Sequence, residues 1–438
     1  MKTNTLKSSK SKILSGNIIL PGDKSISHRA IILSALAIGN SKIYGLLESD
    51  DVINTIKSMR NLGVTILKKK DYFLVQGNGG MFEKKTEKLY FGNSGTGVRL
   101  ITGMLSTKKI KMKLTGDESL STRPMQRVID PLNLIGANIE SNNGKLPITI
   151  NVSELLMPEK FISEIGSAQI KSAFLLAALN ISGTSTFVEK KPSRNHSEIM
   201  LKNFGAKISV KKRGTSNIIK IFGSTPLESK NVRVPGDFSS AAFIIVAVLL
   251  VPGSNVILEN IGLNFYRTGL IDVLKKMGAR IKVKRTWLVN GEKVGDLEVF
   301  SSKLKSISLD GEISARMIDE YPILFVAASF ANGITFLKNL DELKFKESDR
   351  LNSMAEALRK CGVEISVKNN SIKIFGKQKQ KGGCEVKSFK DHRIAMALLV
   401  FGMVSEEPVS VDEVGMIETS FPDFYLKMKK IGANIEFI

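Results

Sequence analysis

Basic side chains gather in short stretches of this chain that glycine or proline bounds. In Pro21-Gly-Asp-Lys-Ser-Ile-Ser-His-Arg29, Ser25 and Arg29 fall on one face of an expected helix, and Lys24 stands at its start. Lysine supplies a point charge, and arginine a planar fork that matches phosphate or carboxylate oxygens. The stretch predicts an anion site, although a capped surface helix would contain the same residue types.

A glycine-rich turn and two further arginine-bearing segments extend this basic set. Gly92-Asn-Ser-Gly-Thr-Gly-Val-Arg99 leads into an apolar run and offers backbone N–H groups to an anion. Its glycine spacing fits neither a dinucleotide fingerprint nor a P-loop. Arg123 precedes a proline, where a lone arginine is also typical of a surface. Lys346-Glu-Ser-Asp-Arg350 opens another expected helix, which Ser348 or Asp349 can cap.

Each of the three histidines stands beside an arginine in a segment of this kind. The pairs are His28-Arg29, Arg194-Asn-His196 and His392-Arg393. A satisfied structural hydrogen bond explains any one of them, and we assign none a catalytic role.

The first basic segment has a second copy without its charges. Pro235-Gly-Asp-Phe-Ser-Ser-Ala-Ala-Phe243 lies 214 positions further on, with Phe238 in place of Lys24 and Phe243 in place of Arg29. Both copies open an apolar, helix-like run. We therefore expect the uncharged copy to serve as scaffold.

A smaller unit is repeated six times. The pattern Leu/Met-x-x-apolar-Gly-Ala/Val-x-Ile recurs every 69 to 84 residues, with its glycines at Gly63, Gly136, Gly205, Gly278, Gly362 and Gly432. It predicts a helix end, a left-handed glycine and then a strand. Six copies at a nearly constant period indicate a repeated α/β unit.

A second series of polar helix starts runs in step with the first. Its members are Asp23-Lys-Ser, Asn93-Ser-Gly-Thr-Gly, Ser167-Ala-Gln, Asp237-Phe-Ser-Ser, Asp319-Glu-Tyr and Asp391-His-Arg. We expect their Asp, Asn and Ser residues to act as N-caps. If three units surround a pseudo-threefold axis, three helix N-termini converge in each domain, and two facing domains make an anion-binding cleft.

Three units precede Ser224 and three follow it, so we place the hinge within residues 224–236. The predicted N-terminal lobe is residues 21–230, and the predicted C-terminal lobe is residues 1–20 with 231–438. The last unit ends after one strand, and we expect the strand around Ile18 to Leu20 to complete it.

Composition narrows the classes of protein. The chain has 438 residues, which exceeds what one core usually supports, and 42% of them are hydrophobic. Its longest apolar run is too short to cross a bilayer, and its basic N-terminus lacks the apolar region of a secretory signal, although a short organellar presequence stays open. Two cysteines give neither a zinc spacing nor a disulfide framework, which favours the cytoplasm.

The net charge of +22 raises nucleic acid as a partner. Aromatic residues make up only 7% of the chain, and no basic-aromatic stacking motif or zinc finger appears. We expect no nucleic acid and no membrane as partners, and we expect a monomer. A positive field also attracts a small anionic substrate.

Nine segments of the chain are, in order, PGDKSISHRA, GNSGTGVRL, LSTRPM, SAQIKSA, SRNHSE, IDEYPIL, KESDRL, DHRIAMAL and SFPDF. Together they closely resemble the 3-phosphoshikimate 1-carboxyvinyltransferase (EPSP synthase) family, in its class II bacterial branch. The resemblance covers nearly the whole chain. It implies the inside-out α/β barrel fold, with two domains of three α/β units each and helix N-termini facing an interdomain cleft. It also implies transfer of the enolpyruvyl group of phosphoenolpyruvate to the 5-hydroxyl of shikimate 3-phosphate, with release of phosphate.

The resemblance also implies site residues. Those expected to hold shikimate 3-phosphate are Lys24, Ser25, Arg29, Ser167, Ala168, Gln169, Arg194, Asp319 and Lys346. Those expected to hold phosphoenolpyruvate are Lys24, Gly95, Arg123, Gln169, Arg350 and Arg393.

By the same resemblance, Asp319 is the base near the attacking hydroxyl and Glu347 the proton donor. A carboxylate pair serves both steps when the surroundings separate the two protonation states. Lys24 stabilises charge on the phosphate. Neither a metal nor an organic cofactor is expected, because phosphoenolpyruvate already carries its activated group.

Two positions depart from family patterns. Class I members carry a lysine just before their Phe-Pro-Asp motif, where this chain has Glu418-Thr-Ser-Phe421. Class II members that resist glyphosate tend to have alanine where this chain has Gly95. The missing methyl group leaves room for the inhibitor, so we expect sensitivity.

Two alternatives remain open. The sister enolpyruvyl transferase that acts on UDP-N-acetylglucosamine typically has a cysteine in the loop before its Arg-Pro, and residues 115–123 contain none. A non-enzymatic anion-binding protein predicts basic residues without carboxylates among them, which Asp319 and Glu347 oppose.

Overall fold

The computed structural model describes residues 4–438 and divides the chain into two compact lobes. The first lobe is Gly22–Val234 together with Leu288–Glu292. The second lobe is the chain up to Pro21, Pro235–Trp287 and Lys293–Ile438. Each lobe encloses its own hydrophobic core.

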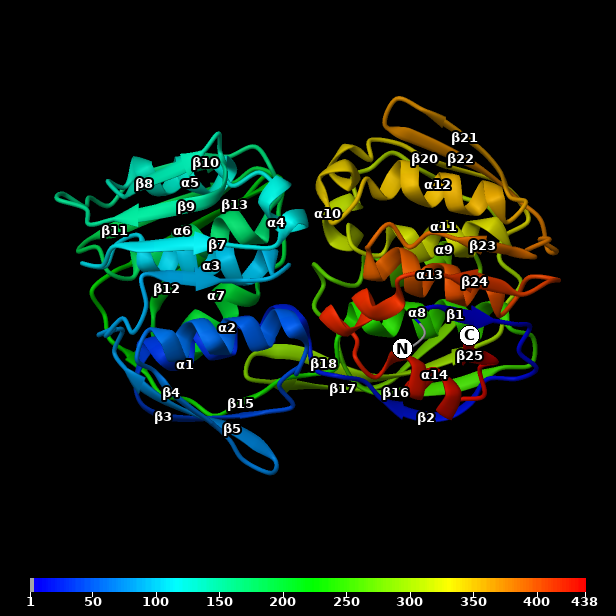
Figure 1. Cartoon of the computed structure of the whole chain (residues 1–438), viewed down its shortest axis with the longest axis horizontal. Coiled ribbons are helices and arrows are strands. Elements are labelled where there is room, and N and C mark those ends of the chain that lie inside the picture. Colours follow the sequence, from blue (N-terminus) through cyan, green and yellow to red (C-terminus); the bar gives the residue numbers. More distant parts are fainter. Residues whose placement is uncertain (1–3) are drawn as a thin grey trace. The chain divides into compact units, whose positions relative to one another are not determined.

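Three sheets surround the core of the first lobe (Figure 1). In hydrogen-bonding order, the first sheet is β14 (Leu227–Glu228), β3 (Ala37–Tyr44), β5 (Tyr72–Asn78) and β4 (Thr65–Lys68), and β15 (Val232–Arg233) also pairs with β3. The second sheet is β6 (Lys88–Tyr90), β7 (Met112–Thr115), β9 (Lys145–Asn151) and β8 (Asn138–Asn142). The third sheet is β10 (Lys160–Ser163), β11 (Thr184–Glu189), β13 (Ser216–Phe222) and β12 (Lys207–Arg213).

Three sheets likewise surround the core of the second lobe. The first of them, in hydrogen-bonding order, is β2 (Ser15–Ile19), β16 (Asn255–Gly262), β18 (Glu292–Phe300) and β17 (Arg280–Val289). The second is β19 (Ser308–Leu309), β20 (Gly333–Leu337), β22 (Ser371–Gly376) and β21 (Glu364–Lys368). The third is β23 (Cys384–Val386), β24 (Val409–Val411), β1 (Leu6–Ser8) and β25 (Ile435–Phe437).

All six sheets share one plan, as the sixfold repeat predicts. The first strand runs parallel to the second, and the third runs antiparallel to the second. The repeat glycines all have positive φ, between 86° and 101°, and each lies just past the end of a helix. The prediction of a two-lobed α/β protein with three repeated units in each lobe is confirmed.

Helices fill the centre of each lobe, inside the sheets. The inner helices are α1 (Lys24–Leu36), α3 (Gly95–Leu105) and α6 (Ala168–Ala178) in the first lobe, and α8 (Phe238–Leu250), α11 (Tyr321–Ser329) and α13 (His392–Gly402) in the second. Nearly every residue of these helices is buried: most are apolar, and the charged Arg29, Arg99 and Lys171 are buried with them. No helix in the described part of the chain has the length and apolar character needed to cross a membrane.

A second helix in each unit ends two residues before the repeat glycine. These helices are α2 (Asp50–Asn61), α5 (Gln126–Leu134), α7 (His196–Asn203), α9 (Gly269–Lys276), α12 (Arg350–Lys360) and α14 (Phe424–Lys430). The remaining helical segments are α4 (Glu118–Thr122), α10 (Ser314–Met317), η1 (Asp341–Phe345) and η2 (Val414–Thr419).

The N-terminal strands differ from the prediction. β2 does not complete the last unit, because it pairs in parallel with β16 in the fourth unit. The strand that completes the last unit is β1, which lies between β24 and β25 and is antiparallel to both. The segment before Pro21 therefore supplies one strand to each of two sheets.

The prediction that all six polar helix starts are N-caps is wrong at one of them. Side chains cap five inner helices: Asp23, Ser94, Ser167, Asp237 and Asp391 each accept a backbone N–H of the first turn. In α11, Glu320 occupies the N-cap position without such a bond. Asp319, one residue earlier, is therefore not a helix cap.

The two cysteines are free thiols in the second lobe. Their sulfur atoms lie 3.2 Å apart, and burial raises the pKa of the Cys361 thiol.

We expect the close approach behind one repeat glycine to be measurable. A Cβ atom at Gly136 would lie 2.0 Å from the Leu155 carbonyl oxygen, whereas at Gly205 the nearest contact would be 3.5 Å away, on the Glu228 side chain. Alanine at Gly205 should lose about 1–2 kcal/mol of stability through left-handed strain alone. Alanine at Gly136 should lose about 1–3 kcal/mol more through overpacking. Urea unfolding of the two variants tests this, and equal losses would contradict it.

Candidate active site

The start of α1 presents the first predicted cation. Asp23 accepts the N–H of Ile26 at 2.9 Å and so fixes the first turn. Lys24 is the first residue of α1, and its Nζ lies 2.9 Å from Oδ2 of Asp51 on α2. Ser25 follows it in that turn, and its carbonyl accepts a hydrogen bond from Arg29 at 2.9 Å.

Arg29 is buried and holds three elements together. Its Nε donates to Ser197 Oγ at 2.7 Å, and its Nη2 donates to Ser172 Oγ at 2.6 Å. These hydroxyls belong to α7 and α6, and they are themselves 2.6 Å apart. Burial lowers the pKa of Arg29 to about 10, partly offset by Glu198, so the guanidinium stays charged at neutral pH.

A buried ion cluster, which the sequence analysis did not predict, involves the same two helices, α6 and α7. Lys171 on α6 is 0% exposed, and its Nζ lies 2.8 Å from Glu198 and 3.1 Å from Glu189. Burial by itself lowers the pKa of Lys171, but the two carboxylates outweigh it and raise that pKa. The lysine within the apolar run of α6 is the signal that could have revealed this cluster.

The starts of α3 and α6 form a second group in the first lobe. Gln169 accepts a hydrogen bond from Arg99 Nη1 at 2.8 Å and donates to Thr96 Oγ1 at 3.0 Å. A Cβ atom at Gly95 would lie 3.0 Å from Arg99 Nη1 and 3.2 Å from Arg123 Nη1. The glycine therefore lets two guanidinium groups approach the backbone.

The other predicted first-lobe residues adjoin these groups. Arg123 donates to the side chains of Asn93 and Ser119. Ser167 caps α6, and Ala168 is the first residue of that helix. Arg194 precedes α7, close enough for its charge to act on Arg29.

His28 and His196 make hydrogen bonds to other side chains, which gives both of them a structural role. His28 Nδ1 lies 2.8 Å from Thr55 Oγ1, and His196 Nδ1 lies 2.6 Å from Glu292 Oε1. Burial, with the charges of Lys24 and Arg29, lowers the pKa of His28 to about 3.

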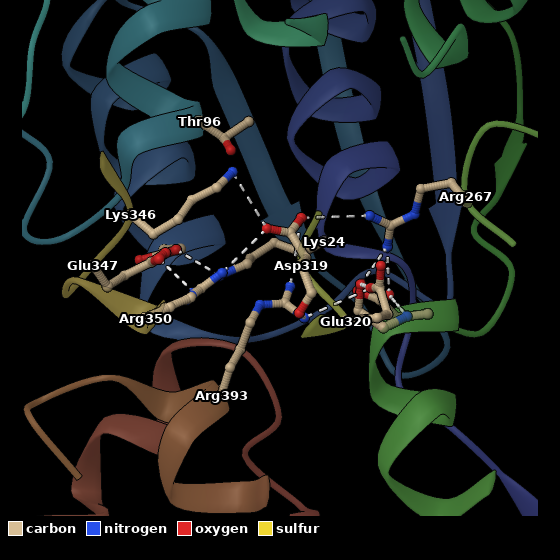
Figure 2. Close-up of polar contacts among 12 residues, drawn as sticks. Lys24, Thr96, Arg267, Asp319, Glu320, Lys346, Glu347, Arg350 and Arg393 are labelled. Carbon is tan, nitrogen blue, oxygen red and sulfur yellow. Dashed lines mark hydrogen bonds and ion pairs between the residues drawn. The ribbon is translucent and has the colours of Figure 1, made fainter. Parts of the chain in front are cut away.

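In the second lobe, Arg350 is the centre of the predicted cluster (Figure 2). It opens α12, is fully buried, and reaches three carboxylates: Asp391 at 2.8 Å, Glu347 at 2.5 Å and Asp319 at 3.3 Å. Burial alone lowers the pKa of Arg350, but the three carboxylates outweigh it and raise that pKa. Asp349 caps α12, and Ser348 donates to Asp391 instead.

Asp319 lies among four cations, each within 4 Å. On Oδ1 they are Arg350 at 3.3 Å and Lys346 at 3.6 Å. On Oδ2 they are Arg393 and Arg267, each at 3.9 Å (Figure 2). Opposite charges at these distances stabilise an ionised carboxylate.

Arg393 ties the start of α13 to the segment before α11. Its Nη1 donates to the Asp319 carbonyl oxygen at 3.1 Å and lies 3.8 Å from Glu320 Oε1. Glu320 also accepts a hydrogen bond from Ser239 at the start of α8. The structure thus brings Asp319, Lys346, Glu347, Arg350 and Arg393 into one cluster of the second lobe.

Sequence reasoning missed Arg267 and Glu320. Arg267 lies in the loop between β16 and α9, outside the six polar helix starts that the sequence analysis collected, so no pattern marked it. Glu320 lies beside Asp319, and a second acidic residue directly after the first was the signal that could have found it.

Each lobe therefore offers distinct chemistry. The first lobe places cations and helix N-termini together, which suits anion binding. The second lobe sets two carboxylates in different surroundings among cations, which suits proton transfer next to a bound anion.

Comparisons with known proteins agree over nearly the full length. The family model described as EPSP synthase (3-phosphoshikimate 1-carboxyvinyltransferase) matches residues 8–428. The 3-phosphoshikimate 1-carboxyvinyltransferase of Bartonella quintana is 45% identical over 440 residues, covering 99% of this chain and 99% of that protein. The one from Nitrobacter winogradskyi is 44% identical over 442 residues, covering 99% and 98%.

Solved structures show the same fold. EPSP synthase from Acinetobacter baumannii matches with a TM-score of 0.87 and 37% identity, covering 99% of both chains. The enolpyruvyl transferase NikO from Streptomyces tendae matches with a TM-score of 0.78 at 16% identity, covering 100% of this chain and 99% of that one. The second match bears on the fold alone.

The depressed pKa of His28 predicts acid sensitivity of the first lobe. Above pH 6.5 the imidazole is neutral in both folded and unfolded chains and costs nothing. As the pH falls from about 6.5 to about 3, the unfolded chain binds a proton that the folded chain refuses, so stability falls by about 1.4 kcal/mol per pH unit. His28→Asn should flatten this part of the curve, as urea midpoints between pH 7 and pH 4 would show. An unchanged slope would contradict the assignment.

Proposed function

The chain belongs to the EPSP synthase family, and from that premise we propose how its residues carry out the family's reaction. The enzyme transfers the enolpyruvyl group of phosphoenolpyruvate to the 5-hydroxyl of shikimate 3-phosphate and releases phosphate, in aromatic amino acid biosynthesis. The observation that carries the assignment of roles is the pair Asp319 and Glu347, which both contact Arg350.

We propose that the first lobe contributes most of the shikimate 3-phosphate site. Its groups are Lys24, Ser25, Arg29, Ser167, Ala168, Gln169 and Arg194, with Asp319 and Lys346 from the second lobe. Lysine and arginine at helix N-termini suit a phosphate ester. The internal hydrogen bonds of Arg29 support a role in which it holds the Ser172 and Ser197 hydroxyls as well as the phosphate.

Phosphoenolpyruvate is assigned to Lys24, Gly95, Arg123, Gln169, Arg350 and Arg393. Its carboxylate and phosphate need several cations, and these residues supply four. The proximity of Gly95 to Arg123 supports placing one anionic group against the N-terminus of α3.

Two proton transfers complete the addition step. Asp319 accepts the proton of the 5-hydroxyl, because its carboxylate is held ionised by surrounding cations. Glu347, whose side chain is more exposed than that of Asp319, donates a proton to the methylene carbon. Elimination then breaks the C–O bond to phosphate in the tetrahedral intermediate, with Lys24 stabilising the charge of the leaving phosphate, while the ionised Glu347 takes a proton back from the methyl group to restore the C=C bond.

The finer points of state and partner are also proposals. A reactive enolpyruvyl intermediate requires that water be excluded, so we expect substrates to draw residues of both lobes together. We propose a cytoplasmic monomer that uses neither metal nor organic cofactor and binds neither nucleic acid nor membranes.

The assay that tests the function measures phosphate release from phosphoenolpyruvate. Release should require shikimate 3-phosphate. Asp319→Asn and Glu347→Gln should each lower kcat by about 100-fold or more while the fold stays intact, since general acid–base groups contribute 10²–10⁴-fold. Glu364→Gln, an exposed carboxylate that lies 3.9 Å from Lys377, is the matched control and should keep full activity. Near-wild-type turnover of both site variants would refute the roles.

Gly95 generates a second prediction, on inhibition by glyphosate. We expect the wild-type enzyme to be inhibited competitively with phosphoenolpyruvate. Gly95→Ala places a methyl group 3.0 Å from Arg99 Nη1 and 3.2 Å from Arg123 Nη1, so it should raise the inhibition constant by about tenfold or more. Inhibition curves at several phosphoenolpyruvate concentrations measure this, and millimolar tolerance of the wild type would be the contrary result.

A further inference from the structure

The four cations around Asp319 differ in whether the proposed function assigns them to a substrate. Lys346, Arg350 and Arg393 are the groups that the proposed function assigns to substrate anions. When substrates bind, these three cations are shared with incoming phosphate or carboxylate groups, which weakens their hold on Asp319. The fourth cation, Arg267, has no such assignment.

Arg267 is fixed by the start of α8. Its Nη2 donates to Asp237 Oδ1 and to Ser239 Oγ, each at 2.9 Å, and the side chain is 3% exposed. Its Nη1 lies 3.9 Å from Asp319 Oδ2 (Figure 2). A guanidinium held at this depth by two partners keeps its place when a ligand arrives.

We propose that Arg267 is the positioning residue for the base Asp319. It stays beside the carboxylate in the substrate complex, keeps it ionised and keeps Oδ2 oriented while the other three cations engage substrate. This inference rests on the proposed function, and it adds a residue that acts through Asp319 without touching substrate.

The other charged groups around Asp319 leave this role to Arg267. Asp391 and Glu347 share the charge of Arg350, and Glu320 lies beside Arg393. Asp237 offsets part of the Arg267 charge, but it also caps α8 and so immobilises its partner. A fixed cation contributes more to an active site than one that must reorganise.

The uncharged copy of the repeated segment therefore has a function beyond scaffold. Lys24 follows the cap Asp23 directly in the first copy, whereas Phe238 follows the cap Asp237 in the second. The cation of the second copy comes from a later loop, as Arg267. On this proposal the second copy is more than the scaffold that the sequence analysis expects.

The test is a single-turnover measurement of phosphate release against pH, with both substrates saturating. Loss of Arg267 makes Asp319 easier to protonate, so the base needs a higher pH. Arg267→Met should move the acidic midpoint up by about one pH unit and lower the rate below that midpoint by about tenfold. Arg267→Lys should restore most of the midpoint because it keeps the charge.

Arg316→Met is the matched control. Arg316 lies in the same lobe, pairs with Asp272 at 2.7 Å and stacks on Phe265 at 3.7 Å. Its loss affects packing without removing a cation from Asp319, so its acidic midpoint should equal that of the wild type. An equal shift in both arginine variants would overturn the proposal.

A double variant protects the test against misfolding. Arg267→Met alone leaves the buried carboxylate of Asp237 without this partner, whereas Asp237→Asn with Arg267→Met removes both charges and retains a capping side chain. The double variant should show the same midpoint shift. Wild-type enzyme that releases no phosphate with both substrates would reject the proposed function itself. Active wild-type enzyme with an unshifted midpoint in these variants would reject the role of Arg267.

Discussion

A guanidinium taken out of water must be paired, and in the second lobe that requirement organises the site. Arg350 is fully buried, and it contacts carboxylates from three segments: before α11, at the start of α12 and at the start of α13. Removing Arg350 would leave the buried carboxylate of Asp391 without this cation in a region of low dielectric, which is costly. The ion pairs therefore fix the starts of the inner helices α11 and α13 relative to each other. They also bring the carboxylates of Asp319 and Glu347 to the same guanidinium group.

The repeated architecture makes this possible because helix starts are equivalent positions. Five of the six inner helices use a side chain to cap their first turn. In α11 that task is left undone, and Asp319 and Glu320 make ionic contacts instead. A capping carboxylate accepts a hydrogen bond from a backbone N–H group. A carboxylate that exchanges protons is better placed when it does not also have to make this hydrogen bond. The departure from the repeat thus coincides with the proposed base.

Repetition also explains what the sequence predicted and what it did not. The six glycines have a single structural cause, a left-handed residue after a helix, so their spacing predicted both the units and the lobes. Lys346, Glu347 and Arg350 were found because they are adjacent in sequence. Arg267 and the Lys171 cluster were missed because their partners, Asp319 and Glu189, lie 52 and 18 residues away and meet them only through the fold. The strand β2 was assigned to the wrong sheet because parallel and antiparallel partners cannot be distinguished in a short apolar run.

The two N-terminal strands bear on how the chain is made. β2 finds its partner only after residue 255 has been synthesised, and β1 finds its partners only after residues 409 and 435. At a synthesis rate of about 5–20 residues per second, β1 waits on the order of tens of seconds with unpaired backbone groups. The first lobe, nearly continuous in sequence, is free to fold during that time. Completion of the second lobe therefore waits for residues 409–437, so a nascent chain that has passed residue 292 but not residue 409 contains every segment of the first lobe and a strand β1 whose partners are not yet made.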